Sequence, residues 1–179
     1  MLEQYKKARN EKMVKDLLQY PVNESQEALD AFSISPMLRD EAMHGLGIGT
    51  TRDMRSVITG IFLPVMGSRV YTLAEKINIW RGKAFLNKTT DLRRRINLTD
   101  LTSVVTKISI PVYILGGAYD YTVSYTEAKT YLEKLSAPVK GFYTFENSAH
   151  SPMFEEPERF RSIIREDVLN GVTGMADVF

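Results

Sequence analysis

Cysteine is absent from this sequence of 179 residues, and histidine occurs only twice, at positions 44 and 150. The absence of cysteine excludes disulfides, thiolate metal ligands and a cysteine nucleophile. A metal held by His150 and Glu155 would need further ligands that the sequence does not offer, so we expect no metal site. The sequence also lacks a glycine-rich phosphate loop, so it does not support nucleotide binding. No other cofactor is expected.

Long hydrophobic runs and a strong net charge are missing as well. The longest weakly polar run, residues 57–67, contains Pro64 and is too short to span a bilayer. The charged N-terminus, MLEQYKKARNEK, lacks the apolar core of a signal peptide, so a cytoplasmic location is the default expectation. The formal net charge of +1 favours no nucleic acid, and the arginine run at 93–95 predicts a solvated helix face.

Residues 1–105 carry the patterns of helices. Apolar spacing and capping signals predict helices at residues 2–19, 25–32, 36–44, 51–60, 72–86 and 91–96. The fourth of these depends on a weak capping box from Thr50 to Asp53, whereas the fifth has a stronger one from Thr72 to Glu75.

With 44% hydrophobic and 25% charged residues, the composition is that of a globular protein with one domain, or one domain and a lid.

The character of the sequence changes near residue 105. The continuous apolar run ISIPVYILGG, residues 108–117, is typical of a parallel strand covered on both faces. A capping box at Ser124 begins a helix to residue 135, a second strand follows at 140–147, and a last helix begins near residue 157. The pattern predicts an α/β fold with a β-α-β-α unit and two parallel strands.

Two polar residues follow these strands directly. Asp120 comes after the first strand and His150 after the second, and neighbouring parallel strands end at the same edge of a sheet. The two side chains can therefore meet. A carboxylate bonded to one imidazole nitrogen fixes the tautomer and leaves the other nitrogen free to take a proton from a nucleophile.

Simpler roles are open for each candidate residue. His150 can be an ordinary polar loop residue, and Asp120 can cap the turn before the helix at 124. His44, near a predicted helix end, can meet exposed backbone carbonyls. The apolar side chains of the helical region can simply pack against one another.

A family resemblance rests on two stretches. IPVYILGGAYDYTVSY and FYTFENSAHSPMFEEPERF resemble the C-terminal part of an α/β-hydrolase, which implies that Asp120 is the acid and His150 the base of a catalytic triad. Residues 106–179 would then be the C-terminal part of the hydrolase core. Residues 1–105 resemble the helical cap of that family.

The cap resemblance has its own motifs. MHGLGIGT and YTLAEKINIWRGK are similar to the caps of proline-iminopeptidase-like members. The resemblance implies a small ester, amide or peptide substrate. Its pocket under the cap would be lined by His44, Phe62, Met66 and Trp80.

The family's nucleophile is missing from this sequence. None of the serines has a glycine two residues before it and another two residues after it, as the Gly-x-Ser-x-Gly elbow requires. We therefore interpret the chain as a C-terminal fragment of the fold, inactive alone, whose first strand lacks a neighbour. It should pair with a second copy or with a missing N-terminal half.

Two other classes of protein remain as alternatives. The chain can be a non-catalytic binding or assembly module formed from a truncated hydrolase, including an oligomer with exchanged elements. A small flavodoxin-like protein is the other, although that fold needs at least four strands where the sequence predicts two.

Overall fold

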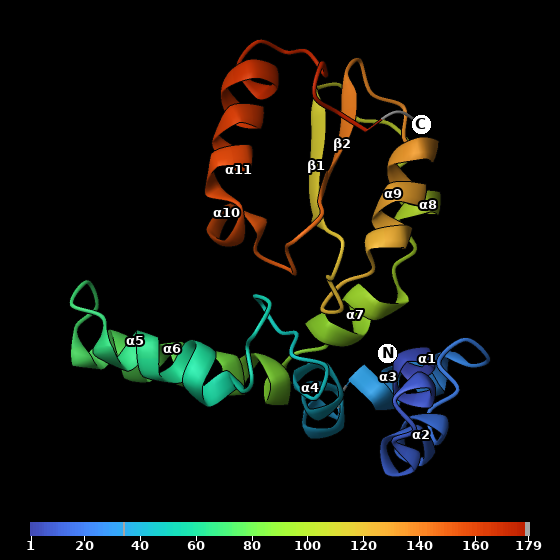
Figure 1. Ribbon diagram of the computed structural model, residues 1–179, viewed down its shortest axis with the longest axis vertical. Helices are drawn as coiled ribbons and strands as arrows, with labels where there is room; N and C mark the ends of the chain where they lie inside the picture. The colour runs from blue at the N-terminus through green and yellow to red at the C-terminus, as the bar shows by residue number, and fades with distance from the viewer. Residues whose placement is uncertain (34, 178–179) are drawn as a thin grey trace. The chain divides into compact units, whose positions relative to one another are not determined.

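The computed structural model describes residues 1–33 and 35–177 (Figure 1). The chain divides into two compact units. A helical unit comprises Met1–Leu46 and Arg55–Thr99, and an α/β unit comprises Gly47–Met54 and Asp100–Phe179. Among the described residues, no helix combines the length and the hydrophobicity that crossing a bilayer requires.

The first part of the helical unit consists of α1 (Leu2–Lys7), α2 (Glu11–Leu18), α3 (Gln26–Ser33) and α4 (Pro36–His44). The single helix predicted at residues 2–19 is wrong, because Arg9 adopts a positive φ of 54° and interrupts it. The side chain of Asn10 then caps α2 by accepting a hydrogen bond from the Met13 N–H. A core of Tyr5, Met13, Leu17 and Ala42 joins these helices.

The second part of the helical unit consists of η1 (Ile58–Phe62), α5 (Leu63–Gly67), α6 (Leu73–Thr89) and α7 (Leu92–Leu98). The capping box from Thr72 to Glu75 is confirmed at the start of α6. The predicted helix start at residue 51 is wrong. Asp53 has a positive φ of 64°, and the Thr50 hydroxyl donates to the Met54 sulfur instead of capping a helix.

The α/β unit contains two strands, β1 (Val112–Gly117) and β2 (Lys140–Phe145). They pair in parallel, with Val112 opposite Lys140 and Gly117 opposite Phe145, so the predicted parallel pair is confirmed. The helices of this unit are α8 (Leu101–Val104), α9 (Tyr125–Lys134), α10 (Pro152–Glu155), α11 (Pro157–Ile163) and η2 (Ile164–Val168).

Helices cover both faces of the strand pair, as the apolar run of the first strand predicts. Figure 1 shows β1 and β2 side by side between α9 and α11. Alternate residues divide between two cores. Val112, Ile114 and Phe142 pack with Leu132 and Leu135 on the α9 side. The other core, on the α11 side, contains Tyr113, Leu115, Tyr143, Phe145, Phe160 and Ile163.

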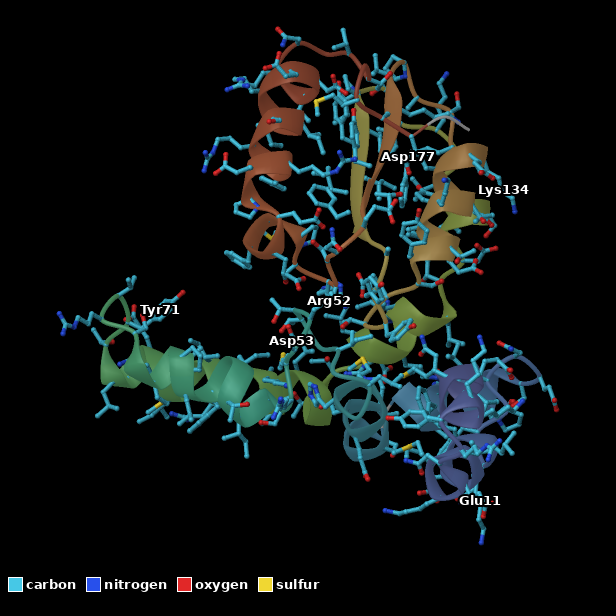
Figure 2. All side chains as sticks on the ribbon, viewed as in Figure 1. Glu11, Arg52, Asp53, Tyr71, Lys134 and Asp177 are labelled. Carbon is cyan, nitrogen blue, oxygen red and sulfur yellow. The ribbon has the colours of Figure 1, made fainter. Side chains whose placement is uncertain are left out.

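The two outer edges of the sheet differ. The C-terminal segment runs along β2, where the Asp177 N–H donates to the Phe142 carbonyl at 2.8 Å. The Asp177 carboxylate also accepts from the N–H and the hydroxyl of Thr144, and Figure 2 shows Asp177 between β2 and α9. Within the described part of the chain, β1 forms a sheet with β2 alone. The outer edge of β1 therefore has no paired strand among the described residues.

A buried carboxylate fixes the C-terminal segment to the core. Asp167 is only 2% exposed. Its Oδ2 accepts from the Tyr143 hydroxyl at 2.8 Å and from the Met175 N–H at 2.8 Å. Burial, with the nearby Asp167 carboxylate as a second cause, raises the pKa of the Tyr143 phenol well above its ordinary value. Tyr143 therefore stays protonated and donates to Asp167.

Replacing Tyr143 with Phe should lower the free energy of unfolding by about 1–3 kcal/mol, because the buried carboxylate loses a donor. Tyr113 is a matched control, since its ring lies 6.3 Å from that of Tyr143 and its buried hydroxyl has no partner among the described residues. Tyr113→Phe should be neutral or stabilising. Urea unfolding measures both changes, and equal losses of stability would contradict the assignment.

Candidate active site

The loops that carry Asp120 and His150 both begin at the C-terminal ends of the strands, at the same end of the sheet. Asp120 lies three residues beyond the end of β1, and His150 lies five residues beyond the end of β2. Because the two strands are parallel neighbours, these loops meet. Nδ1 of His150 lies 2.9 Å from Oδ2 of Asp120.

Asp120 uses its two carboxylate oxygens for different partners. Oδ1 accepts from the Thr122 N–H at 2.9 Å and from the Val123 N–H at 3.0 Å, which caps the turn before α9. Oδ2 faces His150. The side chain is 7% exposed. The turn-capping role and the contact with histidine are therefore not alternatives, because the capped turn holds the carboxylate in the position where it meets the imidazole.

The two nitrogens of the His150 ring have different surroundings. Its side chain is 38% exposed. Among the residues that the structure describes, Nε2 makes no hydrogen bond, whereas Nδ1 is bonded to Asp120. When the neutral ring carries its proton on Nδ1, it donates to Asp120, and Nε2 then presents a lone pair that can accept a proton from a bound group.

Gly117 allows the loop of His150 to approach β1. A Cβ at this position would lie 2.0 Å from the Ala149 carbonyl oxygen and 2.4 Å from that of Ser148, so no other residue fits without displacing the loop. In the space so provided, the Tyr119 N–H donates to the Ser148 carbonyl at 3.0 Å. The sequence places Gly117 at the end of a strand but does not indicate this close approach of the His150 loop.

Two consecutive glutamates also hold the loop of His150. Glu156 Oε2 accepts from the Asn147 N–H at 3.0 Å and from the Ser148 hydroxyl at 2.6 Å. Glu155 Oε2 accepts from the Ala149 N–H at 2.8 Å. The sequence offers Glu155 only as a metal ligand and does not indicate this role. The available signal is the pair of carboxylates five and six residues after the histidine.

In residues 1–33 and 35–177, no group of three or more His, Cys, Asp or Glu side chains is arranged to hold a metal ion.

The four residues expected to line a substrate pocket lie in the helical unit, whereas His150 and Asp120 lie in the α/β unit. Phe62 and Trp80 are in contact, with ring centroids 5.2 Å apart. His44 is the last residue of α4, as the helix-end interpretation requires. Met66 is half-buried in α5, where its carbonyl accepts from Lys76. That these residues line a pocket stays a prediction.

Comparison with known proteins finds distant relatives. A stretch of 117 residues, 65% of this chain, is 32% identical to a probable aminopeptidase of Bacillus subtilis and covers 36% of that protein. A stretch of 70 residues, 39% of this chain, is 29% identical to a Mycoplasma genitalium protein provisionally named an esterase/lipase and covers 26% of it. A Mycoplasma pneumoniae protein of the same name is 30% identical over 73 residues, 41% of this chain, and 26% of it is covered.

The matches thus span about a third of the Bacillus relative and about a quarter of each Mycoplasma relative. No family model matches the chain. No solved structure matches it either.

The contact between Asp120 and His150 predicts the tautomer of the neutral imidazole. In proton–nitrogen NMR spectra, His150 should carry its proton on Nδ1, and Asp120→Ala should abolish that preference because the carboxylate acceptor is lost. Since His44 is the other histidine of the chain, His44→Gln assigns the signals, and the His44 signals should not respond to Asp120→Ala. A protonated Nε2 in the unaltered chain would contradict the geometry.

Proposed function

We propose that this chain is the acid- and histidine-bearing C-terminal part of a serine-type α/β-hydrolase that cleaves an ester or amide bond. The observation that carries the proposal is the 2.9 Å contact between His150 and Asp120, on loops that follow two neighbouring parallel strands. A carboxylate that holds one imidazole nitrogen while the other stays open is the arrangement that nucleophile activation needs.

The relatives support a hydrolase-type function. Both names that they carry, aminopeptidase and esterase/lipase, denote enzymes that hydrolyse amide or ester bonds. Because this chain spans only about a third of the Bacillus relative, the activity of a whole protein and its small ester, amide or peptide substrate belong to the proposal. No cofactor is part of it.

In the proposed reaction, Nε2 of His150 takes the proton of a serine hydroxyl as that oxygen attacks the substrate carbonyl. Asp120 stabilises the imidazolium that forms and keeps the ring in place. His150 then returns the proton to the leaving group. The serine and the N–H groups that bind the oxyanion come from residues outside this sequence, because no serine of the chain lies in a Gly-x-Ser-x-Gly turn.

In this proposal the helical unit serves as the cap over the substrate. The contact of Phe62 with Trp80 offers an apolar surface for an acyl or amino-acid side chain, with Met66 and His44 as further lining residues. A cap of this kind excludes water from the reacting groups, which strengthens their electrostatic interactions.

The open edge of β1 supports the proposal that a strand is missing. β1 is apolar on both faces and packs against both cores, as an interior strand does, yet within the described residues its sheet contains only β2. The strand that completes the sheet would come from an N-terminal half of the protein or from a second copy of this chain.

The function is tested with p-nitrophenyl esters and aminoacyl p-nitroanilides on this chain and on a chain extended through the reading frame upstream of Met1. The short chain should be inactive. The extended chain should hydrolyse one substrate class, and His150→Ala should reduce its kcat by about four to six orders of magnitude, because nucleophile activation is lost.

Several outcomes would overturn the hydrolase proposal. They are turnover by the extended chain that survives His150→Ala, and an upstream sequence without a serine elbow. His150-dependent turnover by the short chain would refute the missing nucleophile. An inactive extended chain would favour the non-catalytic assembly module, which the exposed apolar side chains of Val70, Leu73 and Phe85 also suit.

The missing strand predicts association in solution. Light scattering and sedimentation should show this chain as a concentration-dependent oligomer, because an open interior strand offers unpaired backbone groups to a partner. Addition of the N-terminal half should replace the self-association. A stable monomer at low micromolar concentration would contradict the prediction.

A further inference from the structure

One segment from the first half of the chain belongs to the α/β unit. This segment, the 47–54 loop (Gly47–Met54), groups with the strands, whereas the chain on either side of it belongs to the helical unit. Two backbone hydrogen bonds close the loop, from the Asp53 N–H to the Gly47 carbonyl at 2.7 Å and from the Gly49 N–H to the Thr51 carbonyl at 3.0 Å. These two bonds tie the beginning of the loop to its end.

Glu155 connects the 47–54 loop to the loop of His150. Its Oε1 accepts from the Arg52 N–H at 2.6 Å, and its Oε2 accepts from the Ala149 N–H at 2.8 Å. Ala149 directly precedes His150. One carboxylate thus joins two backbone segments that are about a hundred residues apart in the sequence, and hydrogen bonds to a charged acceptor are stronger than neutral ones.

Arg52 also reaches the loop that bears the acid. Its guanidinium carbon lies 4.0 Å from the centroid of the Tyr119 ring, the residue before Asp120. Figure 2 labels Arg52 and Asp53 on the 47–54 loop. Through Glu155 and Tyr119, this one loop contacts the segments that carry both members of the His150–Asp120 pair.

From these contacts we propose that Glu155 is a positioning residue that couples the 47–54 loop to the loop of His150. A displacement of the 47–54 loop is thereby passed to the His150–Asp120 pair. The inference rests on the proposed function, because a ligand that shifts the 47–54 loop would regulate that reaction. Glu156 is different, since its contacts with Asn147 and Ser148 stay within the loop of His150.

Amide hydrogen exchange of the unaltered chain provides a first test. The Arg52 and Ala149 amides share one acceptor group, so they should be protected to a similar degree and open together. Rapid exchange at Arg52, as in a solvated loop, with continued protection at Ala149 would overturn the proposal. This measurement does not depend on the folding of any variant.

Glu155→Gln provides the second test. A glutamine has a single acceptor oxygen, and its NH₂ group would face an N–H donor, so it cannot hold both amides. The Arg52 and Ala149 amides should exchange about tenfold faster or more, and the Nδ1-protonated signal of His150 should weaken. Unchanged exchange and an unchanged His150 signal in the folded variant would overturn the proposal.

Two substitutions of the same kind serve as controls. In Glu156→Gln the single amide oxygen can still accept from both partners of Glu156 Oε2, so the Arg52 amide should keep its protection. Among the described residues, Glu158 pairs on the surface with Arg161 alone, and Glu158→Gln should change neither amide. Equal effects of all three substitutions would reveal general loosening and overturn the specific role of Glu155.

Kinetics of the extended chain separate this inference from the proposed function. Glu155→Gln should lower kcat about tenfold or more with little change in KM, because ring placement is altered and substrate binding is not. Hydrolysis with an unchanged kcat would overturn the positioning role and leave the function intact. If the Arg52 and Ala149 amides exchange together but the extended chain hydrolyses no substrate, the coupling of the two loops stands and the proposed hydrolase function is overturned.

Discussion

The hydrogen bond between Nδ1 of His150 and Oδ2 of Asp120 is the contact on which the loops of the α/β unit converge. A partly exposed pair of this kind contributes little stability of its own, so its geometry has to be imposed by its surroundings. Backbone N–H groups hold Asp120, and Glu155 and Glu156 hold the loop of His150. The missing side chain at Gly117 lets the two loops close on each other.

The strand pair supplies the frame for this contact. Parallel strands whose faces are both covered by helices can shift little against each other, because the apolar residues of β1 and β2 alternate between two separate cores. The loops therefore start from fixed positions. The same frame explains the partner that we propose, since β1 has the apolar faces of an interior strand and pairs within the described chain with β2 alone.

The sequence predicted what depends on local patterns. An uninterrupted apolar run indicated β1, and a capping box indicated α6. Asp120 and His150 could be identified as candidates because each follows the end of a predicted strand. Contacts between distant segments were beyond such patterns. The stripe of residues 2–19 gave no sign that Arg9 would adopt a positive φ, and nothing near Arg52 indicated that its N–H would bond to Glu155, about a hundred residues away.

We propose that Asp120 and His150 serve a serine that lies outside these 179 residues. Labelling with a fluorophosphonate, which reacts with a serine activated by a histidine base, tests this most directly in a chain extended through the upstream reading frame. We expect one labelled serine in the added segment and loss of labelling in His150→Ala. A label on a residue of the present sequence, or labelling that persists without His150, would contradict it.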